Sequence, residues 1–498
     1  MLRSLGLPLL ATLAVLFAAS SSLHAAGKTV PVFSLKGTVS EKPAGESFPF
    51  GPLDAASFRE IVGRLDQAAA DDKVAGVVLF LEGAEFGHAQ REELHAAMQR
   101  LRTAGKPIYA HGDMTMTGGY ALLAGVDRLS FTPTGYLFIT GLYGEQPYVR
   151  GLLDRLGVEP DFLHCGAYKS AGEMFMLDGP SEEAATMYKW LYDGIYDGLL
   201  QLIADGRKVD VAEAKKWIDE GLYSAEKAQA DGLIDAVEHR DEFVAHIKSV
   251  HGDDVVFDTK YGRKQQQTID FNNPFEVMQF YMDLLAGPKP KRYTKDAVAV
   301  VYVEGSILPG SPQPSMFGGA EGAYGDPIRK ALDKAAEDKT IKAVVLRVDS
   351  PGGSAVASEV ILQATQRLAA KKPLIVSMGN VAASGGYYVS LGSKHVFADP
   401  STITGSIGVV SGKIATTAMW SKLGVTFHPI ERGERAGLLG TGRVFSTANV
   451  MRCKRGWTTS TGCSSSTSSM FVARNWRSRS TNSRAAGCSR VDRRWSSD

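Results

Sequence analysis

Short apolar runs alternate with amphipathic stretches along most of the chain. Residues 77–81 read VVLFL and residues 343–348 read AVVLRV, and the stretch before each has apolar positions three to four residues apart. Compact β-rich runs indicate buried strands, and the longer period indicates helices that lie on a sheet. Their regular alternation predicts an α/β fold built from stacked βαβ units.

The pattern occurs twice, at a shift of 267 positions. IVGRLDQAAADDKVAGVVLFL (61–81) matches IRKALDKAAEDKTIKAVVLRV (328–348), and the Gly-Gly-Tyr triplet at 118–120 falls on the one at 385–387. Self-similarity at a fixed spacing is the mark of a duplicated unit. The sequence therefore predicts two homologous halves that share one fold.

These matches set the expected domain boundaries. The first repeat covers residues 27–250 and the second covers 296–450. Residues 251–295, which include an amphipathic stretch and then PKPKRY, are expected to link them.

The first 26 residues have the composition of an export signal. Arg3 precedes a mostly apolar run over 5–19, and small residues follow at Ala25 and Ala26. This order is typical of a signal peptide, and the run is short of the ~20 residues that span a bilayer comfortably. We expect residues 1–26 to be a cleaved signal peptide or a short membrane anchor, so that the body of the protein is exported.

The tail over 451–498 departs from the repeat pattern. It contains ten Lys or Arg and two Asp or Glu, is rich in Ser, and lacks an apolar period. Such a composition is typical of disorder, and it also resembles a coding sequence read out of frame. The last elements of the second repeat are then expected to be missing, and failure to fold is one alternative for the chain.

Glycine-rich turns distinguish the second repeat. DSPGGS (349–354) follows a strand and precedes a helix, so the N–H of Gly353 is a candidate donor to an oxyanion. Ser384 lies at a second strand-to-helix turn, where the next N–H, that of Gly385, faces the same side. The first repeat has Phe86 in place of Gly353 and Thr117 in place of Ser384.

The first repeat carries the complementary group. Lys169 follows a strand in GAYKSAGEMF, and its counterpart in the second repeat is Ala436. A serine hydroxyl needs a base to become a nucleophile, and a lysine acts as that base when burial keeps it neutral. Two partial sites make one Ser–Lys site if the halves pack together, with Ser384 as nucleophile and Lys169 as general base.

Composition removes some functional classes. The formal net charge of +1 gives no overall support for nucleic-acid binding. The four cysteines and ten histidines show no metal-ligand spacing, so no metal or other cofactor is expected.

Four motifs in order, YKSA, DSPGG, ASGGYY and TGSIGV, resemble the signal peptide peptidase A (protease IV) family in its long, two-repeat form. The resemblance covers about residues 29–446. It implies tandem repeats of the ClpP/crotonase type and a homo-tetramer with apolar peptide grooves. It also implies a serine endopeptidase that degrades signal peptides after export, in the periplasm or at the periplasmic face of the inner membrane. It assigns Ser384 and Lys169 as above, and Ser406, in TGSIGV, is the candidate for a hydrogen bond to the lysine.

Two other functions remain open from the sequence. One is a catalytically inactive peptidase-like scaffold. The other is a crotonase-like acyl-CoA enzyme, against which the expected export argues, because coenzyme A is cytoplasmic. A serine-reactive probe that labels Ser384 would favour the peptidase.

Overall fold

The computed structural model describes residues 28–43, 56–263, 273–278, 282, 295–312 and 322–461. Residues 1–26, expected to carry the export signal, lie outside the described residues, as does most of the linker and the tail beyond 461. Within the described residues, no helix has the length and apolarity to cross a bilayer.

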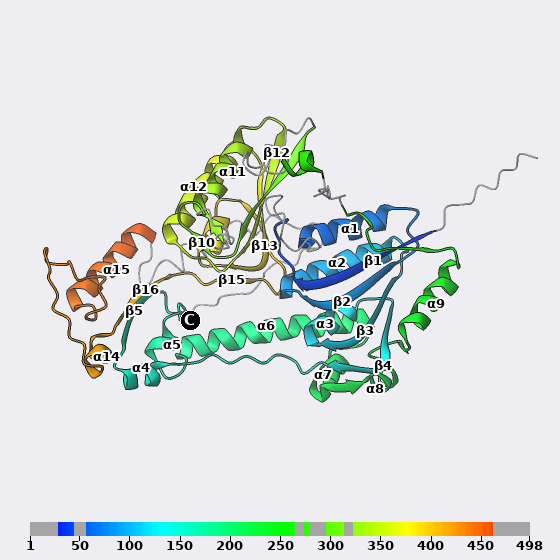
Figure 1. Ribbon diagram of the computed structural model, residues 1–498, viewed down its shortest axis with the longest axis horizontal. Helices are drawn as coiled ribbons and strands as arrows, with labels where there is room; N and C mark the ends of the chain where they lie inside the picture. The colour runs from blue at the N-terminus through cyan, green and yellow to red at the C-terminus, as the bar shows by residue number, and fades with distance from the viewer. Residues whose placement is uncertain are drawn as a thin grey trace, which may run out of the picture.

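The first repeat is a twisted sheet with helices on both faces (Figure 1). Its sheet order is β6-β4-β3-β2-β1-β8, with β7 beside β4, and the β1–β4 neighbours pair in parallel. The strands are β1 (Thr29–Thr38), β2 (Val77–Glu85), β3 (Ile108–Met116), β4 (Arg128–Phe138), β5 (Glu159–Cys165), β6 (Leu222–Ser224), β7 (Ala236–Val237) and β8 (Val256–Asp258). The helices are α1 (Phe58–Ala70), α2 (His88–Thr103), α3 (Thr117–Leu123), α4 (Arg150–Leu156), α5 (Glu173–Met176), α6 (Glu182–Arg207), α7 (Val211–Glu220), α8 (Ala225–Ala230) and α9 (Arg240–His251).

The second repeat has the same plan in a smaller sheet, β14-β13-β12-β9, with β15 beside β13. Its strands are β9 (Ala297–Glu304), β10 (Ile307–Leu308), β11 (Ala323–Tyr324), β12 (Ile341–Ser350), β13 (Leu374–Ala383), β14 (His395–Phe397), β15 (Ile403–Gly405) and β16 (Val409–Ala415). Its helices are α11 (Gly325–Glu337), α12 (Ala355–Ala369), α13 (Gly385–Ser390), α14 (Thr417–Lys422) and α15 (Thr447–Thr461). The predicted α/β class and the tandem repeat are confirmed.

Local sequence explains why these elements form where they do. Ser57 and Glu60 make a capping box at the start of α1, and Ser354 caps α12 by accepting a hydrogen bond from the Ala357 N–H. Along α11 the buried positions include Ile328, Leu332 and Ala335, which share the face toward the sheet. Each repeat therefore builds its own apolar core between sheet and helices.

The register of the strands repeats as the sequence does. Met114 pairs with Tyr136 across β3 and β4, and 267 positions later Val381 pairs with Ile403 across β13 and β15. The turn after β3 in the first repeat is thus the structural counterpart of the turn after β13, where Ser384 lies. The strand pairing of the two repeats therefore agrees with the sequence repeat residue by residue.

Two segments differ from expectation. Strand β8 lies inside residues 251–295, the expected linker, and pairs with β1, so it extends the first sheet. Helix α15 continues to Thr461, so the disorder expected from Met451 onward is wrong for residues 451–461. Helix α15 lies 267 positions after the first half of α6, and it contacts β5 of the first repeat.

Candidate active site

Ser384 lies on a strained turn between β13 and α13. It is the N-cap of α13 with φ 51° and ψ −114°, and it is half-buried. Its N–H donates to the Gly405 carbonyl at 2.8 Å, which continues the pairing of Ala383 with Gly405. A non-glycine residue at positive φ costs about 1–3 kcal/mol and persists only where its surroundings enforce it. The turn thus holds the hydroxyl at the end of the strand.

The DSPGGS turn packs directly against this serine and the residue after it. A methyl group at Gly352 (φ 94°) would come 2.8 Å from Ser384 Cβ and 2.5 Å from Gly385 N. A Cβ at Gly385 would lie 3.3 Å from Gly353 N, so the backbones of Gly353 and Gly385 are close neighbours. Only glycine permits this approach of backbone to backbone.

Ser350 supports the turn from below. Its Oγ donates to the Gly305 carbonyl at 2.6 Å and accepts from the Gly352 N–H at 3.1 Å. The side chain is completely buried. The sequence analysis did not assign it a part, because a serine inside a glycine-rich turn carries no distinctive spacing.

Lys169 is buried in the turn that follows β5. Its side chain is 8% exposed, and Nζ donates to the Ser406 carbonyl at 2.8 Å and to Ser406 Oγ at 3.0 Å. Burial lowers the pKa of the Lys169 ammonium below its ordinary value. Among the described residues, Nζ makes no hydrogen bond to Ser384 Oγ.

A strand pair between the repeats brings the two halves of the site together. β5 of the first repeat and β16 of the second pair antiparallel, with Cys165 opposite Val409. The turn carrying Lys169 leaves the end of β5, and the loop carrying Ser406 enters β16 at the same end of this ladder. The loops are in close contact, because a Cβ at Gly408 would lie 3.3 Å from Lys169 Cβ.

Lys169 is therefore connected to the turn that carries Ser384 through one residue, Ser406. Ser406 has φ 49° and directly follows Gly405, whose carbonyl holds the Ser384 N–H. The Lys169 amine and the Ser384 backbone N–H thus bind two consecutive residues, Ser406 and Gly405. Catalytic hydrogen bonds are often long in the absence of substrate and form in the complex.

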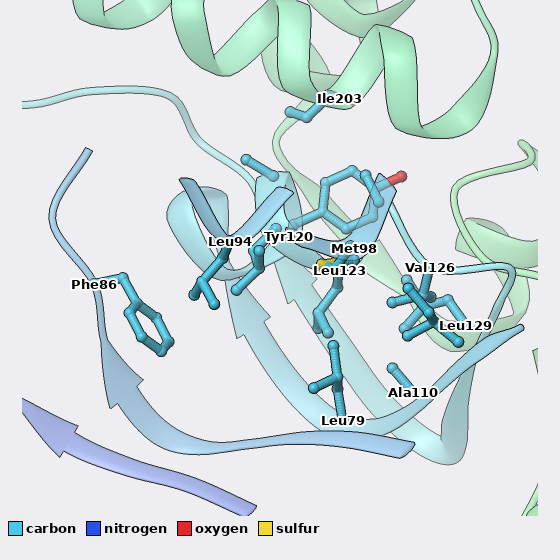
Figure 2. Packing of buried hydrophobic residues seen from close by; sticks show 14 of the residues in the cluster. Leu79, Phe86, Leu94, Met98, Ala110, Tyr120, Leu123, Val126, Leu129 and Ile203 are labelled. Carbon is cyan, nitrogen blue, oxygen red and sulfur yellow. The ribbon is translucent and has the colours of Figure 1, made fainter. Parts of the chain in front are cut away.

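The counterpart of this site in the first repeat is filled. Phe86, which replaces Gly353, is 6% exposed and packs in the first core with Leu79 and Leu94 (Figure 2). The Arg91 guanidinium lies against Gly118, where a Cβ would be 2.5 Å from Nη2. Lys169 of the first repeat instead approaches the second repeat, where its Nζ donates to Ser406.

No cation site accompanies these residues. In the described ranges, no group of three or more His, Cys, Asp or Glu side chains is arranged to hold a metal ion.

Comparison with known proteins finds a similar family. The model of "Peptidase family S49" matches residues 100–252 and 366–450, which hold Lys169 and Ser384 respectively. Segments of both repeats are therefore similar to peptidase family S49. The α/β architecture with parallel sheets in two repeats agrees with this similarity.

Curated relatives of the chain are named proteases. The chain is 31% identical to "Serine protease SPPA, chloroplastic" of Arabidopsis thaliana, over 75% of this chain and 53% of that protein. It is 34% identical to "Protease 4" of Haemophilus influenzae, over 70% of this chain and 55% of that one, and 31% identical to "Protease 4" of Salmonella typhi, over 72% and 56%. The chain spans about half the length of these curated relatives.

Proposed function

We propose that the protein is a serine endopeptidase with one composite Ser–Lys site per chain. Support comes foremost from the β5–β16 pair, because it carries the buried Lys169 of one repeat to the segment that holds Ser384 of the other. The names of the curated relatives support hydrolysis of peptide bonds.

The first chemical step is acylation of Ser384. Neutral Lys169 takes the hydroxyl proton as Oγ attacks the scissile carbonyl carbon, and the carbonyl π electrons move onto oxygen. The Gly353 and Gly385 N–H groups donate to that oxyanion, and each such donor contributes about 3 kcal/mol to transition-state stabilisation. Lys169 then gives its proton to the leaving amine as the C–N bond breaks.

The second step is hydrolysis of the acyl-enzyme. Water attacks the ester carbon while Lys169 accepts its proton, and the Ser384 oxygen leaves and takes that proton back. The balance needs one water per peptide bond and no redox equivalent. No metal or organic cofactor takes part in this scheme.

We further propose apolar peptides as substrates, among them signal peptides left after export. An extended peptide would lie along a strand edge beside Ser384 and pair through its backbone. The expected export signal of residues 1–26 suggests a periplasmic protein, or one at the periplasmic face of the inner membrane. Assembly as a homo-oligomer, a tetramer by family resemblance, belongs to the same proposal.

Hydrolysis of an apolar signal-peptide sequence by the purified chain tests the proposal. We expect cleavage by the parent and a loss of at least about 100-fold in Ser384→Ala and Lys169→Ala. Two matched controls, Ser249→Ala on α9 and Lys330→Ala on α11, change exposed side chains and should retain parental rates. Full activity in either site variant contradicts the dyad, and an inert but folded parent chain supports the inactive scaffold.

A further inference from the structure

Asp349 joins the DSPGGS turn to the strand that carries the nucleophile. Its Oδ1 accepts the Val381 N–H at 2.9 Å, and its Oδ2 accepts Asn380 Nδ2 at 3.1 Å. Both donors lie where the β12–β13 register is irregular, between Val348 and Ser350. The carboxylate therefore pairs with a backbone N–H that the irregular stretch would otherwise leave outside the ladder.

Asn380 continues this connection into the first repeat. Its Oδ1 accepts the Gln90 N–H in the first turn of α2, at 3.2 Å. Gly87, the N-cap of α2, approaches the same amide: the three nearest atoms to a Cβ placed there are Oδ1, Cγ and Nδ2 of Asn380. The Asn380 side chain thus binds α2 through its amide oxygen and Asp349 through its amide nitrogen.

The surroundings of Asp349 make this arrangement costly to change. Burial is the main cause that raises the pKa of the Asp349 carboxyl. The charged neighbours are Arg347, on the same strand, and Glu41, from the loop after β1. A buried carboxylate that loses its donors incurs the desolvation cost of a charged group.

We propose that Asp349 and Asn380 are positioning residues for Ser384. They fix the DSPGGS turn (349–354) against β13. Through Asn380, the geometry of this turn also depends on α2 of the first repeat. The same repeat supplies Lys169, so docking of the first repeat both delivers the base and sets the nucleophile turn. This inference rests on the proposed function, because it concerns how Ser384 reacts.

A double-mutant cycle tests the connection at a distance from the reacting atoms. Gly87→Ala adds a methyl that meets Asn380, so we expect kcat on an apolar peptide, and the rate of phosphonylation of Ser384 by a fluorophosphonate probe, to fall about 10-fold. KM should stay within about twofold, because peptide contacts are unchanged. In an Asn380→Ala background the clash is gone, and Gly87→Ala should cause no further loss.

The control for the cycle is Gly63→Ala. Gly63 is exposed on α1, and a Cβ there meets nothing within 4 Å, so both rates should remain parental. Parental kcat and labelling in Gly87→Ala overturn the proposal. Equal and independent losses in the two backgrounds also overturn it, since they show that the methyl does not act through Asn380.

A second variant addresses Asp349 itself. Asp349→Asn keeps the shape but places an amide against the Asn380 amide, and we expect kcat to fall about 10-fold with KM little changed. The exposed Asp296, which pairs with Lys342, gives the control Asp296→Asn. If Asp349→Asn lowers only the melting temperature and leaves kcat intact, the side chain has a purely structural part and the inference is wrong. If the folded parent is neither labelled nor hydrolyses peptide, the peptidase proposal itself is wrong. If the parent is labelled and both Gly87→Ala and Asp349→Asn are labelled at the same rate, only the positioning inference is wrong.

Discussion

Lys169 Nζ donates two hydrogen bonds to Ser406, a residue 237 positions away in the other repeat, at 2.8 Å to the carbonyl and 3.0 Å to Oγ. The carbonyl bond is set by the backbone, whereas the Oγ bond is set by the side chain. The second bond therefore can be removed on its own.

The first prediction removes that hydroxyl. Ser406→Ala should lower kcat about 10-fold, because a hydrogen bond to a charged or titrating group is worth about 1.5–3 kcal/mol. Steady-state kinetics on an apolar peptide measures the effect, and KM should change little. The control is Ser411→Ala on β16, an exposed serine of the same strand-loop unit. Unchanged kcat in Ser406→Ala would mean that the carbonyl alone orients the lysine.

The second prediction concerns close packing under the nucleophile. Gly352→Ala places a methyl 2.5 Å from Gly385 N and 2.8 Å from Ser384 Cβ, so the oxyanion amides must move apart. We expect kcat to fall by about 100-fold or more, the scale of losing one oxyanion donor. Gly310→Ala is the matched control, since Gly310 also has positive φ (72°) and a Cβ there meets nothing within 4 Å. An equal loss of kcat in both variants would show that backbone strain, rather than the contact with Ser384, is responsible. A parental kcat in Gly352→Ala would contradict the prediction.

The third prediction concerns an ion cluster between the repeats. Arg347 of β12 donates to Glu41 at 2.9 and 3.0 Å and to Glu93 of α2 at 2.6 Å, and its side chain is 10% exposed. Removal of Arg347 leaves the buried Glu41 and the half-buried Glu93 without this charged partner. Arg347→Ala should therefore lower the free energy of unfolding by about 3–5 kcal/mol, measured by urea denaturation.

The control for this cluster is Arg367→Ala, which breaks an exposed pair with Asp333. Exposed pairs contribute about 0–1 kcal/mol, so that variant should unfold almost as the parent does. Equal losses in both variants would show that the buried cluster does not hold the repeats together. Arg347→Lys should not restore stability, because an ammonium cannot form the paired bonds to Glu41.

The fourth prediction is a pH dependence of stability at the same interface. Burial, together with the charges of Glu93 and Glu92, raises the pKa of Asp399 to about 7, while Arg347 opposes the shift. A carboxyl whose pKa is raised by folding binds its proton more tightly in the folded state. Its contribution is therefore fully present below the unfolded pKa and is lost as the pH rises toward about 7.

Asp399→Asn removes this titration. We expect the melting temperature at pH 8 to rise by roughly 2–4 °C, the shift that about 1 kcal/mol gives in a unit of about 150–250 residues, the size of one repeat. At pH 4 the variant and the parent should melt together. The change in melting temperature from pH 5 to pH 8 is compared between the parent and Asp399→Asn. If it is more positive in the parent, the pH effect has the opposite sign to the one predicted and contradicts the assignment to Asp399.

The fold was largely accessible from sequence because it depends on local signals. Buried strands such as β2 and β12, amphipathic helices such as α11, and the 267-position repeat are all visible in the order of residues. The α/β class and the tandem repeat are confirmed on that basis. The complementary loss of Lys169 and Ser384 in opposite repeats is likewise a property of the aligned sequences.

The contacts that join the repeats were not accessible in this way. β5 and β16 have no strand counterparts at the matching positions of the other repeat, residues 426–432 and 142–148, so the repeat gives no hint that they pair. Glu41 and Asn380 are single polar residues whose partners are fixed only when the repeats dock. Periodicity reports which face of an element is apolar, but it does not report which distant element covers it.

The central claim is that a lysine of the first repeat activates the serine of the second. The rate of phosphonylation of Ser384 should rise with pH through a single pKa below the ordinary lysine value, because the probe reacts only when Lys169 is neutral and burial depresses its pKa. Measured across pH 6 to 10 on parent and Lys169→Ala, the account predicts this rising limb in the parent and its loss, with little labelling, in the variant. Labelling of Ser384 at the parental rate and with the parental pH profile in Lys169→Ala would contradict it.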